Sequence, residues 1–259
     1  MHADWLIPDW PAPVNVRAVC TTRSGGVSLP PYDGFNLGDH VGDTPAHVAA
    51  NREELRACLE ARPVFMQQVH GRGVIAVSKD TQDGTAADAC ISTRPGVACT
   101  IMVADCLPVL LADTQGRLVA AAHAGWRGLA GAGQKGILEA VSEEIVAVAR
   151  AKWTSGAIEL VAWLGPCIGP EAFEVGAEVK AAFESHDPTA AQFFKPHTPG
   201  KFLADLQGLA RRRLRALGIT AIHGNDGSAG WCTASNPSRF FSHRRDRVSG
   251  RLAACVWLR

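Results

Sequence analysis

Short apolar runs alternate with polar segments along the chain and predict its strands. Three of these runs, residues 97–103, 107–113 and 117–123, follow one another with only a few polar residues between them. Continuous apolar character over so few residues is typical of strands that are buried on both faces. Further strands are predicted at residues 16–23, 63–71, 73–78, 158–165, 219–223 and 251–258.

Helical patterns fall between some of these strands. Thr44 and Pro45 precede a long helical stretch and predict a helix with Thr44 as N-cap and Pro45 at the first helical position. Apolar residues recur at helical spacing within residues 128–150, where glycines crowd the start. Two more helices are predicted at residues 176–185 and 203–217.

Several of the predicted strands follow one another directly, without helices between them. A strict alternation of strand and helix would indicate a doubly wound parallel sheet, so this order favours an α+β fold. The chain has no internal repeat, no low-complexity segment and no clear linker. We therefore expect a single domain over residues 1–259.

The composition argues against several classes of protein. Hydrophobic residues make up 47% of the 259 positions and charged residues 20%, so the chain can bury a core and is not disordered. The formal charge of +1 argues against general binding to nucleic acid or to an anionic membrane. The most apolar stretch, residues 97–111, is interrupted by Asp105 and Pro108 and is too short to cross a bilayer.

The cysteines and the N-terminus point to the cytoplasm. The eight cysteines are spread over the chain and form no CxxC pair, which is typical of buried thiols in a reducing compartment. The N-terminal segment has neither a cationic leader nor a long apolar run, so we predict no signal peptide. We expect a cytoplasmic protein.

Three strand ends carry a side chain that can bind a metal ion. His70 precedes Gly71, Cys106 follows Asp105, and His123 lies two residues before Gly125, each at the end of an apolar run. One thiolate and two imidazoles suit Zn²⁺ and leave a fourth position for water or substrate. Because 36 and 17 positions separate the three residues, spacing alone does not decide between a metal site and three structural side chains.

The motifs around these residues resemble a known family. The sequence contains QVHG, ADCLPVL, HAGWRG, LGPCIGP with a following FEVG, and FFSHRRD with a later GR, in this order over about residues 21–251. These motifs are similar to those of the YfiH-type proteins. That family has been described variously as laccase-like polyphenol oxidases, purine nucleoside phosphorylases and peptidoglycan-editing factors.

The resemblance implies a fold, an activity and a metal site. The implied fold is a layered α/β-β/α arrangement that is shared with cysteine-hydrolase-like proteins. The implied activity is phosphorolysis of purine nucleosides such as adenosine, inosine and methylthioadenosine, with adenosine deamination as a further activity. The implied metal ligands are His70, Cys106 and His123, with Zn²⁺ as the expected ion. The expected partners are therefore a small-molecule nucleoside and phosphate, with no nucleic acid and no membrane, and the oligomeric state stays open.

The chemistry of these reactions suggests further site residues. Deamination requires a proton carrier, and Asp105 adjoins Cys106, although neighbours on an extended strand point to opposite faces and a structural role is equally consistent. Phosphorolysis requires guanidinium groups and free backbone N–H groups around a dianion. We favour Arg244 for this role, with Arg23 and Arg127 as further candidates. The alternative for the Arg244 segment is that an arginine in it merely pairs with Asp246.

Other residues have a possible binding role beside a structural one. Asn36 could donate to a ribose hydroxyl or cap a turn. Cys167 lies in a rigid loop that could line a pocket, although a buried thiol is the simpler interpretation. Phe240 and Phe241 could stack on a purine or belong to the core. The candidate catalytic residues are thus Cys106, His123, Asp105 and Arg244, and the candidate substrate contacts are Arg23, Asn36 and Cys167.

Rival functions are tested against the same residues. Multicopper laccases as a family have about ten histidines, largely in HxH pairs. This chain has nine histidines and no HxH pair, which argues against a four-copper enzyme. A single Cu²⁺ in the His/Cys/His site stays open, because copper outcompetes zinc in raw affinity. A Cys/His amidase-type hydrolase in peptidoglycan precursor editing, with Cys106 as nucleophile and His123 as base, also stays open.

A run of arginines at residues 211–215 raises the question of nucleic acid. Its helix has an apolar stripe, and the arginines are expected mostly on the opposite, solvated face. We therefore predict no role in binding nucleic acid.

Overall fold

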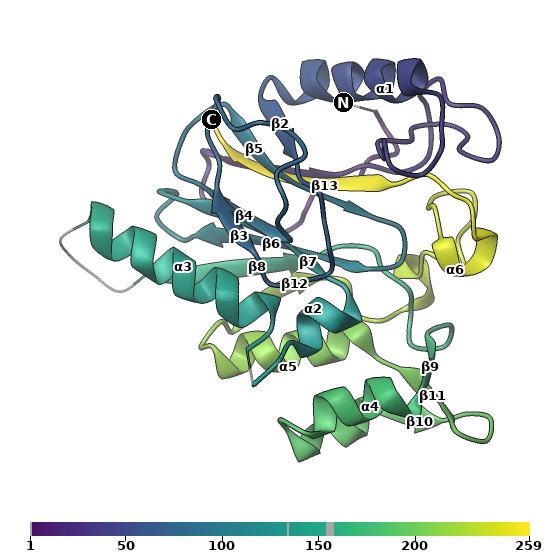
Figure 1. Cartoon of the computed structure of the whole chain (residues 1–259). Helices are drawn as coiled ribbons and strands as arrows, with labels where there is room; N and C mark the ends of the chain where they lie inside the picture. Colours follow the sequence, from purple (N-terminus) through teal and green to yellow (C-terminus); the bar gives the residue numbers. More distant parts are fainter. Residues whose placement is uncertain (1, 134, 154–157) are drawn as a thin grey trace.

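The computed structural model of the protein describes residues 2–133, 135–153 and 158–259. Two β-sheets stack face to face, and helices cover both outer faces (Figure 1). Helix α1 (Pro45–Leu59) covers one face, and α2 (Trp126–Ala130), α3 (Ile137–Lys152) and α5 (Leu206–Ala216) cover the other. This layered arrangement is a mixed α/β fold, in which strands also follow one another without helices, as the sequence predicts.

Each of the two stacked sheets mixes parallel and antiparallel strands. The smaller one has the order β1 (Val16–Cys20), β13 (Leu252–Leu258), β5 (Val97–Val103) and β2 (Arg62–Phe65). The larger one has the order β12 (Ala221–Gly224), β8 (Leu160–Leu164), β6 (Leu107–Asp113), β7 (Val119–Ala124), β4 (Ala89–Ser92) and β3 (Val74–Ala76). A third sheet consists of β10 (Phe194–Pro196), β11 (Lys201–Ala204) and β9 (Glu174–Gly176).

The remaining elements are short and lie at the edges of the layers. Helix α4 (Ala177–Glu184) lies in the chain between β9 and β10 of the third sheet, and α6 (His243–Asp246) lies at one end of the stacked sheets (Figure 1). Two 3₁₀ turns, η1 (Pro188–Phe193) and η2 (Ala229–Trp231), complete the structure. Within the described ranges, no helix is long and apolar enough to cross a membrane.

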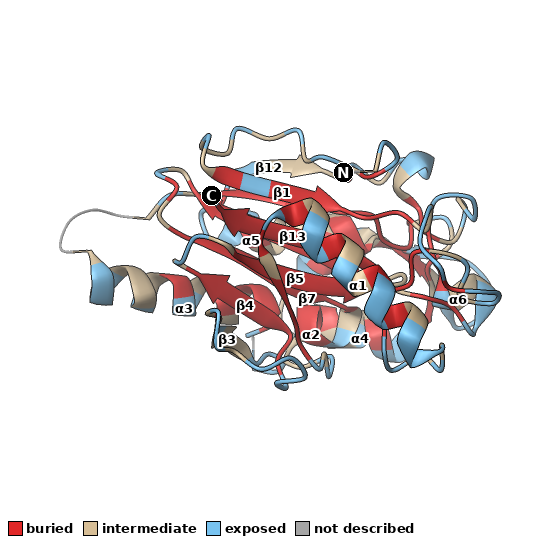
Figure 2. Cartoon of the chain, turned by 90° about the horizontal axis from the view of Figure 1, so that it is seen from above, coloured by how far each residue is buried: buried red, intermediate tan, exposed pale blue. Residues whose placement is uncertain are grey.

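Strand β6 shows why the central apolar runs form two-sided strands. Leu107, Val109 and Leu111 belong to the core under α3 and α5, whereas Leu110 and Ala112 belong to the core between the sheets. All five are fully buried, and Figure 2 shows the neighbouring strands β5, β7 and β13 in the colour of buried residues. Burial of each leucine contributes about 1.5–3 kcal/mol. The bounds of β5 and β6 are those predicted from the sequence.

The first predicted helix is confirmed, and the second is broken in two. Helix α1 begins at Pro45 and packs Leu55 and Leu59 on the smaller sheet. The predicted helix over residues 128–150 consists instead of α2 and α3, because Gly131 has φ +68° and ends α2. Helix α3 begins again after Gly136, and position 134 between them lies outside the described residues.

The helix predicted from residue 203 begins three residues later. Residues 201–204 form β11 instead, which pairs with β9 and β10. The side chain of Asp205 then accepts from Gly208 N at 2.7 Å and caps α5 at its N-terminus. The strand β4 was not predicted, since four residues between polar segments give little periodicity.

Three of the four arginines of α5 pair with neighbouring elements, which corrects the expectation that they lie mostly on a solvated face. Arg211 donates to carbonyl groups in and just after β12. Arg212 forms an ion pair with Asp187, and Arg213 pairs with Glu139 at 2.8 Å. These arginines therefore tie α5 to its neighbours.

All eight cysteines carry free thiols, and six of them are buried. This agrees with the sequence expectation that they form no disulfide framework.

Candidate metal centre

The fold brings His70, Cys106 and His123 together. His70 lies in the loop between β2 and β3, Cys106 immediately precedes β6, and His123 lies in β7, whose antiparallel pairing with β6 sets His123 opposite Pro108. Their ligand atoms all lie within 4.8 Å of one another. The Sγ atom of Cys106 is 3.7 Å from Nε2 of His70, and the two imidazole rings meet at 73° with their centroids 4.7 Å apart.

One of these distances matches the spacing expected around a single tetrahedral metal ion. Zinc bonds of about 2.3 Å to sulfur and about 2.05 Å to nitrogen, at the tetrahedral angle, put the two donors about 3.6 Å apart. The observed separation of 3.7 Å between Cys106 and His70 is close to this value. The three side chains therefore form a candidate site for a metal ion, and the donor set suits both zinc and copper.

A buried carboxylate that the sequence did not suggest, Asp88, orients His123. Its Oδ1 lies 2.9 Å from Nδ1 of His123, and its backbone carbonyl accepts from His123 N at 2.7 Å. Since an ionised carboxylate only accepts, Nδ1 carries the proton and Nε2 is left free to bind a metal ion. Burial alone would raise the pKa of Asp88, but hydrogen bonds from His123 and from backbone N–H groups hold it below its usual value.

The same carboxylate also holds the loop of the other histidine. Asp88 accepts from the backbone N–H groups of Val69 at 3.2 Å, His70 at 2.9 Å and Gly71 at 2.7 Å. These bonds support the left-handed backbone of His70, which has φ +60°. One buried group thus orders both histidine ligands. The sequence feature that could have indicated Asp88 is its position directly before residues 89–92, which form the strand β4 that was not predicted.

Gly125 leaves the space in which the ligands meet. A Cβ atom at this position would lie 2.9 Å from Sγ of Cys106 and 2.9 Å from Cδ2 of His70. Both distances are shorter than normal contacts with a side-chain carbon. The glycine of the HAGW motif is therefore required by the packing of the site.

Without a metal ion, the site holds a thiolate beside an imidazolium. Burial alone would raise the pKa of Cys106, but the charge and hydrogen bonds of His123 and His70 lower it to about 6. Burial would likewise lower the pKa of His123, but the Cys106 thiolate and the hydrogen bond to Asp88 raise it to about 9. At neutral pH the two groups therefore carry opposite charges.

A pocket of about 450 Å³ opens over the ligands and is rich in cationic groups. Besides His70, Cys106 and His123, its lining includes Phe173 and Ile168, together with the basic side chains of His40, Arg127, His243, Arg244 and Arg251. The single acidic residue among its described lining residues is Asp105. This balance of charge favours an anionic ligand.

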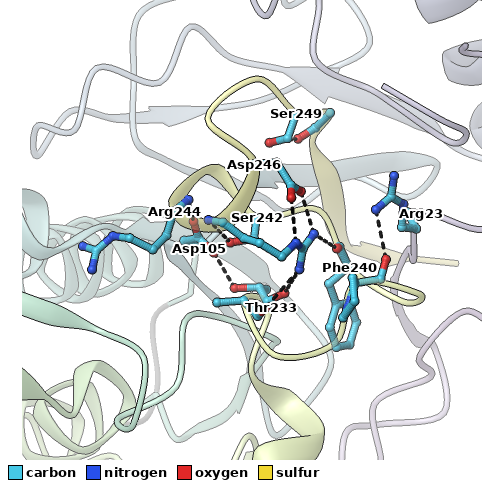
Figure 3. Close-up of polar contacts among 12 residues, drawn as sticks. Arg23, Asp105, Thr233, Phe240, Ser242, Arg244, Asp246 and Ser249 are labelled. Carbon is cyan, nitrogen blue, oxygen red and sulfur yellow. Dashed lines mark hydrogen bonds and ion pairs between the residues drawn. The ribbon is translucent and has the colours of Figure 1, made fainter. Parts of the chain in front are cut away.

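Asp105 and Arg244 both lie in the wall of this pocket. Asp105 has φ +89°, and its two carboxylate oxygens accept from Thr233 Oγ1 and from the backbone N–H of Arg244, both at 2.6 Å (Figure 3). The side chain of Arg244 extends away from Asp105 and donates to the carbonyl of Glu174 at 2.9 Å. The neighbouring Arg245, and not Arg244, pairs with Asp246.

Three predicted substrate contacts are placed outside the lining of this pocket. Arg23 donates to the carbonyls of Asp33 and Pro237 and has its guanidinium over the ring of Phe241. Asn36 is fully buried, and both ends of its amide are hydrogen bonded. Cys167 is also fully buried, and burial raises its pKa well above the ordinary value. Their contacts are structural.

Two phenylalanines considered for purine stacking belong to the core. Phe240 and Phe241 are fully buried between the two sheets. The aromatic residues that line the pocket are instead Trp126 of the HAGWRG motif and Phe173 of the FEVG motif, neither of which was predicted as a substrate contact.

The protein is thus a mixed α/β protein of stacked sheets, with a candidate His/Cys/His metal centre in the lining of a pocket rich in basic residues. Residues 17–259 match the family described as multi-copper polyphenol oxidoreductase laccase. The chain belongs to this laccase-like YfiH family, as its motifs predict.

Relatives and solved structures agree with this assignment. The chain is 51% identical to a purine nucleoside phosphorylase of Pseudomonas aeruginosa and 46% identical to the purine nucleoside phosphorylase YfiH of Escherichia coli, with 98% of each chain covered in both comparisons. A crystal structure of a Neisseria meningitidis protein, 41% identical, matches with a TM-score of 0.86 over 98% of this chain and 99% of that one. YlmD of Geobacillus stearothermophilus, 28% identical, matches with a TM-score of 0.80 over 95% and 93%.

Proposed function

We propose that this protein is a zinc-dependent purine nucleoside phosphorylase that acts on adenosine, inosine and methylthioadenosine and also deaminates adenosine. The observation that carries the proposal is the convergence of His70, Cys106 and His123 at the floor of a cationic pocket. The names of the relatives at 51% and 46% identity support the reaction class. Eight free thiols support a reducing cytoplasm as its place of action.

The proposed reaction needs a cation-rich pocket. Phosphorolysis breaks the bond between the purine nitrogen and C1′ of the sugar and forms a bond from a phosphate oxygen to C1′, so a dianion and a neutral nucleoside must meet. Arg127, Arg244 and Arg251 contribute positive charge to the pocket in which this occurs. A metal ion, when bound, supplies a Lewis acid that polarises an oxygen of a reactant.

The protein's own groups hold the reactants and the ligands in place. The protonated Nδ1 of His123 donates a hydrogen bond to Asp88, so Nε2 of His123 stays available as a metal ligand. Asp105, for which we considered a proton-carrying role, has both oxygens engaged by Thr233 and by Arg244 N. Its contacts support a positioning role, in which it ties α6 to the strand end that bears Cys106.

One observation favours a second candidate, a Cys/His amidase-type hydrolase. A thiolate with a pKa of about 6 beside a histidine with a pKa of about 9 is the arrangement of an activated nucleophile and its acid–base partner. This candidate would also suit a cysteine-hydrolase-like fold. It uses Cys106 and His123 without a metal ion, since a thiolate that is bound to zinc is not free to attack.

The proposed activity is tested by separating the products of adenosine and inosine by chromatography, with and without inorganic phosphate. We expect free base and pentose 1-phosphate to form only when phosphate is present, and inosine to form from adenosine independently of phosphate. The Cys106→Ala variant should lose zinc and both reactions while keeping the fold, because the core does not depend on the metal. Turnover by this variant at the wild-type rate would exclude the site.

A further inference from the structure

Arg251, which directly precedes β13, has its backbone clamped by the segment that contains Asn36. The backbone N–H of Arg251 donates to Oδ1 of Asn36 at 2.8 Å, and its carbonyl accepts from Leu37 N at 3.1 Å. Asn36 is itself fixed, because its Nδ2 donates to Asp43 at 2.8 Å and to the carbonyl of Gly38 at 3.2 Å. The buried amide that the sequence suggested for a ribose thus fixes an arginine.

The stem of Arg251 is fixed by a close approach of Gly38. A Cβ atom at position 38 would lie 2.7 Å from Cγ and 3.2 Å from Cβ of Arg251. These are the inner carbons of the side chain, which cannot move aside as its far end could. Only a glycine at this position lets the arginine pass in its observed direction.

The guanidinium of Arg251, which lines the pocket, has hydrogen-bond donors that the described residues do not use. Its Nη1 donates to the carbonyls of Ser249 at 2.9 Å and Gly250 at 3.1 Å. In the described part of the chain Nε and Nη2 have no acceptor, and neither is sealed from solvent. By contrast, each guanidinium nitrogen of Arg245 has an acceptor in the protein.

Among the described residues, no carboxylate forms an ion pair with this side chain. Arg251 lines the pocket together with Cys106 and Asp105, but the two carboxylate oxygens of Asp105 accept hydrogen bonds from Thr233 and from Arg244 N. Nε–H and Nη2–H form the planar fork that matches two oxygens of a phosphate. A neutral nucleoside offers no such pair of anionic oxygens.

We propose that Arg251 binds the inorganic phosphate used in the reaction, through its Nε and Nη2, and that Asn36 and Gly38 are positioning residues for this arginine. The inference deepens the proposed function and rests on it. It gives the dianion a place in the pocket beside the ligands, and it gives the loop of Asn36 an indirect part in phosphate binding, through Arg251.

The test uses the full-length, zinc-loaded protein and inorganic phosphate as the probe. Calorimetry gives the Kd for phosphate without turnover, and steady-state kinetics give the KM values for phosphate and for inosine. In Arg251→Gln we expect the phosphate Kd and KM to rise about ten- to a hundredfold, because hydrogen bonds to a charged group are lost. The KM for inosine and the zinc content should stay within twofold of wild type.

Two further variants and a control keep the test sharp if Arg251→Gln fails to fold. Arg251→Lys keeps the charge but loses the fork and should have an intermediate phosphate Kd. Gly38→Ala keeps Arg251 but displaces the inner carbons of its side chain, so this variant should bind phosphate more weakly and still bind zinc. Arg247→Gln removes an exposed arginine that is outside the pocket lining and should bind phosphate as wild type does.

The outcomes separate this inference from the proposed function. An unchanged phosphate Kd in the Arg251 variants would overturn the role of Arg251, whatever the protein catalyses. If the wild-type protein binds phosphate but leaves nucleosides intact, the proposed function fails. The comparison of phosphate Kd values then still tests whether Arg251 binds phosphate.

Discussion

At the scale of single residues, Asp88 is the group that orders the candidate metal centre. It accepts from Nδ1 of His123 and from the backbone N–H groups of Val69, His70 and Gly71. A neutral amide cannot serve as a charged acceptor for all four donors. The ring orientation of His123 and the backbone conformation of His70 therefore both depend on this one ionised side chain.

We expect Asp88→Asn to lower the zinc affinity about 10–100-fold, because the carboxylate that orients a histidine ligand is lost. Competition with a chromophoric chelator measures this affinity. Asp113→Asn is the control, since Asp113 is equally buried but pairs with Arg117. A zinc affinity that falls equally in both variants would show a general loss of stability instead.

Gly125→Ala should displace a ligand without removing one. Its added Cβ lies within 2.9 Å of Sγ of Cys106 and of Cδ2 of His70. We expect the variant to fold but to bind zinc weakly, as measured by metal content after dialysis. Gly230→Ala is the matched control, because a Cβ there meets nothing within 4 Å. Full zinc occupancy in Gly125→Ala would contradict the close packing of the site.

The pKa values of the metal-free site predict how zinc binding varies with pH. Between about pH 6 and pH 9 Cys106 is already a thiolate, but His123 carries a proton that zinc must displace. The apparent affinity should therefore rise about tenfold per pH unit over this window and level off above pH 9. Calorimetry in buffers of different ionisation enthalpy counts the released proton, and an affinity independent of pH between 7 and 9 would refute the thiolate–imidazolium pair.

At the scale of elements, helix α5 depends on its N-cap. Asp205→Ala removes the acceptor for Gly208 N and should lower the free energy of unfolding by about 1 kcal/mol in urea denaturation. Asp205→Asn keeps an acceptor and should lose much less. Equal losses in both variants would mean that the negative charge, and not the hydrogen bond, matters at this position.

The elements also show what the sequence can and cannot predict. Strands β5 and β6 are predicted with their bounds, because both faces are buried and the apolar runs are unbroken. Strand β4 is missed, since its four residues owe their structure to pairing with β7 and β3, which no local pattern reveals. The break between α2 and α3 requires the backbone angles of Gly131, which the helical spacing of apolar residues does not report.

The candidate site shows the same division. Local patterns mark His70, Cys106 and His123 as strand-end residues, but only the resemblance to a family joins them, since their meeting depends on the register of β6 against β7 and on the loop of His70. Asn36 and Arg23 have the right chemistry for a ligand. Their donors are used within the protein instead, because neighbours distant in sequence supply acceptors.

At the scale of the whole molecule, the stacked sheets hold the ligands and the pocket wall on different parts of the chain. Cys106 directly precedes β6 and His123 lies in β7, both strands of the larger sheet, whereas Arg251 leads into β13 of the smaller one and Arg244 lies in α6. Figure 1 shows these strands in the two stacked layers and α6 at one end of them. Since the candidate metal ligands and Arg251 come from separate segments, we expect that Arg251 can be substituted without loss of the metal ligands.

The most direct test of the account is to remove the metal ion with a chelator, measure phosphate-dependent cleavage of inosine, and then return one equivalent of zinc. We predict about one zinc per chain in the purified protein, loss of cleavage with the metal, and its return with zinc. Cleavage that persists or increases in the metal-free protein would contradict the account and indicate Cys106 as a free nucleophile.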